Sequence, residues 1–229
     1  MTNLSNPDRA RANMIKQQIR TSNVTNVAVV DALSIVRREE FVPLADKALA
    51  FAELRIPLVQ PAEEALRNGH CMLEPLIEAR ILQELRLKPT DKVLEVGAGS
   101  GYMAALLAQG AQRVITLELH PQLAELARAN LQRAGITNVE VRKADGSKGL
   151  PGEAPFDVIV LSGSVAEVPA ALLAQLKIGG RLSAIVGFDP VMRGTLITRT
   201  GESTYTTAQP WDTVAPRLRN FPEPARFQF

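Results

Sequence analysis

The hydrophobic positions of the chain follow two alternating spacings, and their order predicts a sheet flanked by helices. Short, mainly apolar runs predict strands at residues 93–96, 113–118, 139–141, 156–161 and 181–186. Apolar residues at helical spacing lie between them and predict helices over residues 103–108, 121–134 and 170–176. Because strands and helices alternate, the pattern favours a doubly wound α/β fold, with a parallel sheet and helices on both of its sides.

The first part of the chain has a helical pattern without strands. Helices are expected over residues 8–20, 27–38 and 75–87, and Asn26 is a suitable N-cap for the second of them. Residues 57–68 contain two prolines and a polar stretch, which predicts a loop with one helical turn at most. We therefore expect a helical N-terminal extension ahead of the sheet.

The last part of the chain is expected to leave the regular pattern. Strands are predicted at residues 195–200 and 205–208, and the prolines that recur from Pro210 onward then predict an irregular, mobile tail. The chain is accordingly divided into a helical segment with the acceptor-recognition residues, a sheet domain and a tail, with the bounds 1–88, 89–209 and 210–229.

Composition restricts the class of protein. With 229 residues, of which 46% are hydrophobic, the chain is long enough for one full α/β domain with an added segment. Its net charge of +2 gives no basic excess for a nucleic-acid or membrane surface. The single cysteine, Cys71, excludes an internal disulfide, is typical of a reducing compartment and forms no zinc pattern with the two histidines. Without a leader pattern or an apolar run of about 18 residues, the chain is expected to be cytoplasmic, without a metal or a membrane partner.

Three glycines at alternate positions mark the turn after the first predicted strand of the sheet as a nucleotide-type site. The run reads Glu95-Val96-Gly97-Ala98-Gly99-Ser100-Gly101, and a helix is predicted to follow it. Glycines there allow a sharp turn and a close approach of the backbone to a ligand. The run differs from the dinucleotide pattern, because Tyr102 occupies the third glycine position, and from a P-loop, because no Gly-Lys-Ser/Thr follows.

Two acidic residues follow at the ends of the next two strands. Glu118 lies about 20 residues after the first glycine, where a doubly wound sheet presents an acid to ribose hydroxyls. Asp145, followed by Gly146, ends the third strand, where an acid can meet the amino group of adenine. Ligands of such sheets bind outside the carboxyl ends of the strands, so we expect the glycines, Glu118 and Asp145 to lie together.

The motif Glu95-x-Gly97-x-Gly99-x-Gly101 resembles the first motif of S-adenosylmethionine (SAM) methyltransferases. SAM carries no phosphate, so the missing lysine agrees with this resemblance, which implies a Rossmann-like sheet and SAM as the cofactor. The glycines are then expected beside the amino-acid portion of SAM, with Glu95 orienting the turn or contacting the SAM amino group through water. The residues predicted to bind the cofactor are Glu95, Gly97, Ala98, Gly99, Ser100, Gly101, Glu118, Leu119, Asp145 and Gly146.

Further segments resemble the protein-L-isoaspartate O-methyltransferase family. Residues 36–43 are similar to its V-P-R-E-x-F-V-P segment, and residues 93–102 match its V-L-E-I-G-T-G-S-G-Y almost residue for residue. Residues 14–20, residues 50–51 with 56–57, and residues 154–157 and 175–182 are also similar to segments of the family. The chain is identified as a divergent member, which implies transfer of a methyl group from SAM to a carboxylate of damaged aspartyl residues in proteins or peptides.

The chain departs from the family where the acceptor is expected to bind. The family carries T-I-S-x-P before a helix, and its serine lies by the methyl-accepting carboxylate; the corresponding run here is 71–75, so that Leu73 stands at the catalytic serine position. Leucine donates no hydrogen bond and leaves a neighbouring carboxylate poorly solvated. The family's T-A-A-A after the fourth strand is replaced by Ser162-Gly163-Ser164-Val165, and the spacer 59–68 is longer.

These departures leave three functions open. The first is methylation of isoaspartyl residues, with backbone amides in place of the missing hydroxyl; the second is a SAM methyltransferase with a smaller or less polar acceptor. The third is a protein that binds SAM or S-adenosylhomocysteine (SAH) without turnover. The family resemblance favours the first, whereas Leu73 favours the other two, and the intact cofactor loop counts against a loss of all activity; we expect the first. A carboxylate acceptor is already ionised near neutral pH, so the absence of a general base is no objection. His70 and Cys71 lie in the altered segment and are candidates to face the acceptor.

Overall fold

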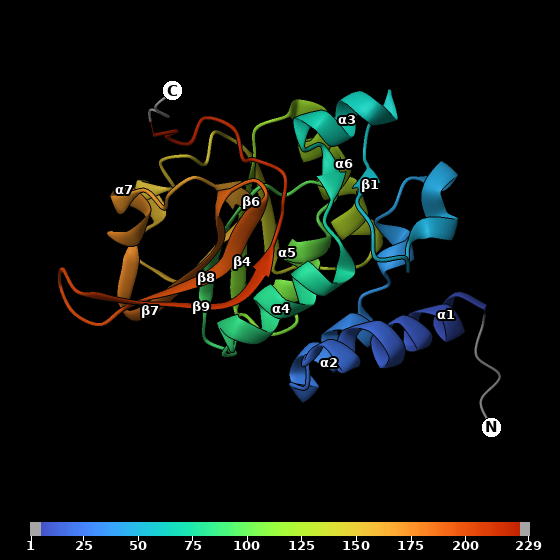
Figure 1. Cartoon of the computed structure of the whole chain (residues 1–229), viewed down its shortest axis with the longest axis horizontal. Helices are drawn as coiled ribbons and strands as arrows, with labels where there is room; N and C mark the ends of the chain where they lie inside the picture. Colours follow the sequence, from blue (N-terminus) through green and yellow to red (C-terminus); the bar gives the residue numbers. More distant parts are fainter. Residues whose placement is uncertain (1–5, 225–229) are drawn as a thin grey trace.

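A seven-stranded sheet forms the centre of the protein, whose structure, a computed structural model, describes residues 6–224 (Figure 1). The strand order is β5-β4-β3-β6-β7-β8-β9. The strands are β3 (Lys92–Val96), β4 (Arg113–Glu118), β5 (Val139–Lys143), β6 (Phe156–Val165), β7 (Leu176–Phe188), β8 (Val191–Arg199) and β9 (Tyr205–Thr213). All pairs from β5 to β7 are parallel, whereas β8 and β9 are antiparallel, so the expectation of a parallel sheet holds only for the first five strands.

Helices cover the two faces of the sheet unequally. The helices are α1 (Asn6–Met14), α2 (Val27–Ile35), α3 (Ala62–Asn68), α4 (Pro75–Leu85), α5 (Tyr102–Ala108), α6 (Pro121–Arg133) and α7 (Ala170–Leu173). On one face, Val93 and Val158 pack with residues of α4, α5 and the N-terminal helices. On the other face, Leu94 and Ile159 pack mainly with α7 and with Phe221 near the end of the chain. Because neighbouring residues of a strand face opposite sides, both faces of the central strands are apolar.

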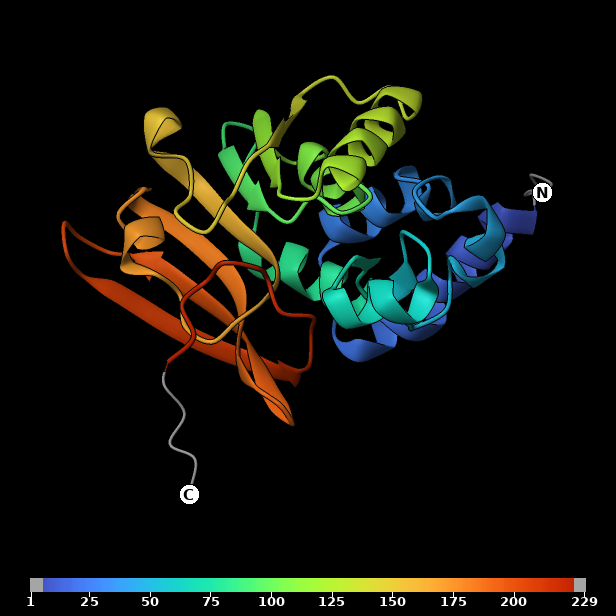
Figure 2. The ribbon, with the colours of Figure 1, turned by 90° about the horizontal axis from the view of Figure 1, so that it is seen from above.

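The N-terminal helices pack on α4, outside the sheet (Figures 1 and 2). The predicted N-cap is confirmed, since the side chain of Asn26 accepts a hydrogen bond from the amide of Ala28 at 2.9 Å. The prediction of a helix to residue 38 was too long, because the chain becomes extended at Val36 and turns Arg38 into the core, where it is fully buried.

Three segments differ from their predictions. The segment 57–68, expected as a loop, contains the two-turn helix α3, and a short antiparallel pair, β1 (Ile56–Pro57) with β2 (Cys71–Met72), flanks it. The predicted helix over 170–176 ends at Leu173, and β7 already starts at Leu176. The expected irregular tail begins later, because β9 runs to Thr213 and includes Pro210. Proline has no backbone N–H to donate to a neighbouring strand, and an edge strand such as β9 tolerates this loss whereas a central strand does not. The end of that tail, 225–229, lies outside the described residues.

We predict that Gly180→Ala destabilises the protein. A β-carbon at residue 180 would lie 2.9 Å from the carbonyl oxygen of Lys177 and 3.1 Å from that of Asp157, and backbone atoms cannot move aside cheaply. We expect urea denaturation to show a loss of about 1–3 kcal/mol in the free energy of unfolding. The matched variant Gly152→Ala, whose β-carbon would meet open space, should stay within about 0.5 kcal/mol of wild type. Equal unfolding midpoints for the two variants would contradict this prediction.

Candidate functional site

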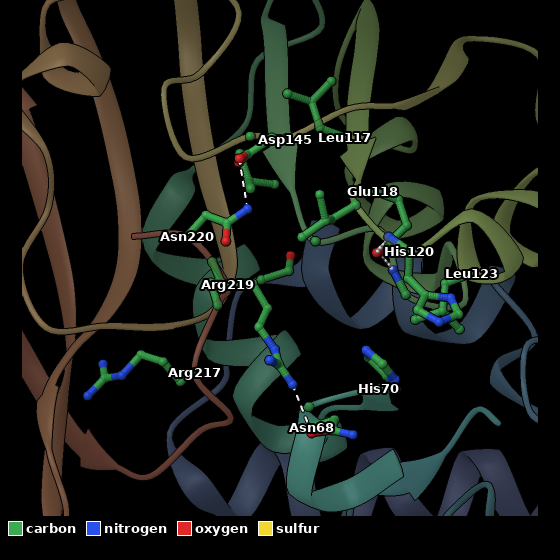
Figure 3. Close-up of a pocket in the computed structure, with 18 of the residues that line it drawn as sticks. Asn68, His70, Leu117, Glu118, His120, Leu123, Asp145, Arg217, Arg219 and Asn220 are labelled. Atoms are coloured by element: carbon green, nitrogen blue, oxygen red, sulfur yellow. Dashed lines mark hydrogen bonds between the residues drawn. The ribbon is translucent and has the colours of Figure 1, made fainter. Parts of the chain in front are cut away.

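The carboxyl ends of the parallel strands open into a cavity of about 440 Å³ (Figure 3). The strand order reverses at β3, because β4 lies on one side of β3 and β6 lies on the other. The cavity is at this switch point, which is the usual ligand position in such sheets. Five short segments line it: 68–71, 96–99, 117–123, 144–146 and 217–221, together with Ser162. The cavity therefore joins the sheet to the end of the chain and to residues 68–75, which we name the acceptor segment.

The glycine loop has the conformation that its sequence predicts. Gly97, Gly99 and Gly101 have φ angles of 96°, 53° and 84°, a region that other residues rarely adopt. Gly97 and Gly99 line the cavity. Gly101 instead lets α5 approach α6, because a β-carbon there would lie 3.2 Å from the carbonyl oxygen of Ala127. Ala98 and Ser100 are buried behind the cavity wall.

The carboxylate of Glu118 connects the glycine loop to the turn after β4. It accepts hydrogen bonds from the amide of Gly99 at 2.8 Å and from the amide of His120 at 2.9 Å. Glu118 is 8% exposed and lines the cavity, and the half-exposed Leu119 lines it as well. A carboxylate held by two backbone donors has a fixed orientation, with lone pairs left for a ligand hydroxyl.

Asp145 lies at the end of β5, on the opposite wall from the acceptor segment. It accepts hydrogen bonds from the amide of Ser147 at 2.9 Å and from the side chain of Asn220 at 2.8 Å (Figure 3). Burial opposes ionisation, but these hydrogen bonds outweigh it and hold the pKa of Asp145 below its ordinary value. Gly146 lies so close to β3 that a β-carbon would be 2.4 Å from Cγ1 of Val96.

Glu95 lies beneath the glycine loop, outside the residues that line the cavity. It is fully buried, and its Oε1 accepts a hydrogen bond from the hydroxyl of Ser162 on β6 at 2.7 Å. Its Oε2 has no hydrogen-bond partner among the described residues. Burial raises the pKa of Glu95 to about 7. The residue thus joins β3 to β6 directly below the place where the loop turns.

The buried Glu95 predicts a pH dependence of stability. Its pKa of about 7 in the folded protein lies above the ordinary value of 4.5, so the folded state binds more protons between these values. Its contribution to stability is therefore full below about pH 4.5 and is lost as the pH rises through about 7. We expect Glu95→Gln to flatten the decline in the free energy of unfolding between about pH 5 and pH 8. The exposed substitution Glu63→Gln should keep the wild-type slope, and a wild-type slope in Glu95→Gln would refute the prediction.

The acceptor segment places only part of its predicted residues at the cavity. His70 and Cys71 line it, as the sequence allowed, whereas the side chain of Leu73 is 7% exposed and belongs to the hydrophobic core. The carbonyl of Leu73 accepts a hydrogen bond from Nη2 of Arg38 at 2.6 Å. Burial raises the pKa of the Cys71 thiol to about 11, so the thiolate is disfavoured at neutral pH.

Two histidines meet at the edge of the cavity. The rings of His70 and His120 lie 4.6 Å apart between centroids, so the acceptor segment touches the turn after β4 (Figure 3). Burial, followed by the charges of His120 and Arg219, lowers the pKa of His70. Like His70, His120 lines the cavity.

Sequence reasoning missed the strap, as we name residues 215–221. The strap crosses the carboxyl end of the sheet, seen in red in Figure 2. Its Arg219 donates to Asn68 at 2.8 Å and its Asn220 to Asp145, so it is tied to both halves of the cavity. The apolar Leu218 and Phe221, set among prolines and charged residues, were the available signal for burial of this segment.

Within residues 6–224, no helix is long and apolar enough to cross a membrane. In the same range, no group of three or more histidine, cysteine or acidic side chains is arranged to hold a metal ion.

Known proteins show the same combination of sequence and fold. The family model described as protein-L-isoaspartate(D-aspartate) O-methyltransferase matches residues 9–209. A protein-L-isoaspartate O-methyltransferase of Koribacter versatilis is 40% identical over 189 residues, which are 82% of this chain and 81% of that one. Its counterpart in Methylorubrum extorquens is 42% identical over 183 residues, covering 79% of this chain and 76% of the relative.

A solved structure agrees with the fold. The crystal structure of a putative protein-L-isoaspartate O-methyltransferase from Plasmodium falciparum, in complex with S-adenosyl-L-homocysteine, aligns with a TM-score of 0.76. The alignment covers 94% of this chain and 99% of that one at 19% identity, a level that speaks for the fold alone.

Proposed function

Because the chain belongs to the protein-L-isoaspartate(D-aspartate) O-methyltransferase family, we propose that it repairs damaged proteins by methylating the carboxylate of their isoaspartyl residues. The enzyme is a methyltransferase that uses SAM. The single observation that carries the proposal is the cavity at the switch point of the sheet, which a glycine loop, Glu118 and Asp145 line together. The single cysteine of the chain is typical of a reducing compartment, and we place the protein in the cytoplasm.

The residues of the cavity fit SAM in size and chemistry. About 440 Å³ is within the range of small-molecule sites, and Gly97, which lines the cavity, presents no side chain to a ligand. In our assignment, Gly97 and Gly99 contact the amino-acid portion of SAM, Glu118 binds the ribose hydroxyls and Asp145 accepts from the adenine amino group. Gly146 and Leu119 complete the wall beside the nucleoside, whereas Glu95, Ala98, Ser100 and Gly101 support the loop from behind.

Methyl transfer depends on how the protein positions the reactants more than on proton transfer. SAM, when bound, supplies a methyl group on a positively charged sulfur. A carboxylate acceptor is ionised near neutral pH and attacks without a general base. The protein therefore has to hold the acceptor oxygen in line with the methyl carbon and the sulfur and to exclude water. The strap and the paired His70 and His120 serve this exclusion, because they close the cavity between its two halves.

The proposed function predicts both binding and transfer. Calorimetry should detect binding of SAM and SAH, and an isoaspartyl peptide should accept radiolabelled methyl whereas the matching aspartyl peptide should not. Asp145→Ala should weaken SAH binding about tenfold, because it removes one charge-assisted hydrogen bond of about 1.5 kcal/mol. Binding of SAM without transfer to the isoaspartyl peptide would refute repair while leaving the cofactor assignment intact.

The substitution Leu73→Ser tests whether the side chain at this position affects transfer or only the stability of the fold. Since the Leu73 side chain packs in the core, we expect Leu73→Ser to lower the free energy of unfolding by about 2–4 kcal/mol. We also expect SAH affinity and isoaspartyl transfer by the folded fraction to stay within about threefold of wild type. A gain of tenfold or so in transfer would show instead that the missing hydroxyl limits the reaction.

A further inference from the structure

The altered run at the end of β6, residues 162–165, holds the strap in place. The amide of Ser164 donates to the carbonyl of Pro216 at 2.7 Å, and the amide of Leu218 donates to the carbonyl of Ser164 at 2.9 Å. The hydroxyl of Ser164 donates to the carbonyl of Ala215 at 2.8 Å. A serine at this position therefore makes a bond that an alanine, the residue of the family's T-A-A-A run, does not make.

Gly163 provides the space into which the strap packs. A β-carbon at residue 163 would lie 2.9 Å from both Cγ and Cδ2 of Leu218 and 3.1 Å from the carbonyl oxygen of Pro216. A change of rotamer at Leu218 moves Cγ and Cδ2 but leaves the contact with the carbonyl oxygen of Pro216, which is a backbone atom. The alanine of the family's run does not fit under the strap, so the changes at 163 and 164 share one physical explanation.

Leu218 is thereby fixed at the point where methyl transfer is expected. Its Cδ2 lies beside both Gly163, at the end of β6, and Gly97, at the end of β3, and the residue lines the cavity. Arg219 and Asn220 tie the strap to Asn68 and Asp145 on opposite walls. An acceptor that approaches the amino-acid portion of SAM must therefore pass the leucine side chain.

We propose that the run 162–164 is a docking platform for the strap, and that Leu218, held by it, restricts the acceptors to carboxylates whose neighbouring side chains are small. The restriction rests on the proposed function, because it concerns the same acceptor site. Gly163 and Ser164 are positioning residues in this proposal, since they act through Leu218, which is the residue that determines specificity.

Hydrogen exchange tests the docking without any acceptor. In the full-length protein, Gly163→Ala should speed exchange of the Leu218 amide about tenfold or more, because the strap can no longer pack closely on residue 163. The double variant Gly163→Ala/Leu218→Ala should bring exchange part of the way back toward wild type, since the shorter contact, with the leucine side chain, is gone and only that with the carbonyl oxygen of Pro216 remains. Gly152→Ala, with open space around its β-carbon, is the matched control and should not change exchange. Wild-type protection in Gly163→Ala would overturn the docking platform.

Acceptor preference tests the role of Leu218. Two isoaspartyl peptides would be compared, one with glycine and one with tryptophan after the isoaspartyl residue. We expect wild type to favour the glycine peptide about tenfold or more in kcat/KM, and Leu218→Ala to reduce this preference below about threefold. Leu44→Ala, a control at a leucine that is 84% exposed and outside the cavity, should keep the wild-type preference.

The outcomes separate this proposal from the proposed function. An unchanged peptide preference in Leu218→Ala would overturn the restriction. SAH binding by Leu218→Ala about tenfold tighter than by wild type would also overturn it, because it would show that the strap blocks the cofactor. Transfer gained only by Leu218→Ala would support it. If both proteins bind SAH and neither methylates either peptide, the repair function and the restriction fail together, whereas hydrogen exchange still decides whether the strap docks on 162–164.

Discussion

The arrangement of the site depends on one buried ion pair, between Arg38 and Glu78 of α4. Arg38 is fully buried and also donates to the carbonyls of Leu73 and Ala50, and its guanidinium lies 4.9 Å from the ring centre of Tyr102. Tyr102 is the first residue of α5, directly after the glycine loop. One side chain thus fixes the acceptor segment, α4 and the cofactor loop relative to each other. Further hydrogen bonds are needed to offset the desolvation of a buried pair, and here the two backbone carbonyls accept two of them.

The cavity is therefore an assembly of segments that are far apart in the chain. Carboxylates tie them together: Glu118 holds the glycine loop, Glu95 bonds to Ser162 on β6, and Asp145 bonds to Asn220 of the strap. Glu95 is fully buried and Glu118 is 8% exposed, and hydrogen bonds in such surroundings are electrostatically stronger than in water. An in-line transfer requires rigidly positioned reactants, since small displacements of the reacting atoms lower the rate strongly.

Local pattern was sufficient for much of the fold. The strands at 93–96 and 113–118, the N-cap Asn26 and the conformation of the glycine loop follow from residue spacing and from backbone freedom, which act over a few neighbours. Errors arose where distant contacts decided. The helix at 27–35 stops early because Arg38 is drawn into the core, and β9 continues through Pro210 because it forms an edge beside β8. The roles of Leu73 and Leu218 also depend on packing, which no local rule contains.

By itself, the sequence determined the class of fold, the family and the group of residues at the carboxyl ends of the strands, since glycines and acids at those positions have few alternative uses. Only the tertiary structure decided which of them reach the cavity: Gly97, Gly99 and Glu118 do, whereas Glu95 and Leu73 are buried away from it. It also decided that the strap closes the site. The physical reason is that side-chain direction and the return of a distant segment are set by the packing of the whole core, with hydrogen bonds between residues more than fifty positions apart.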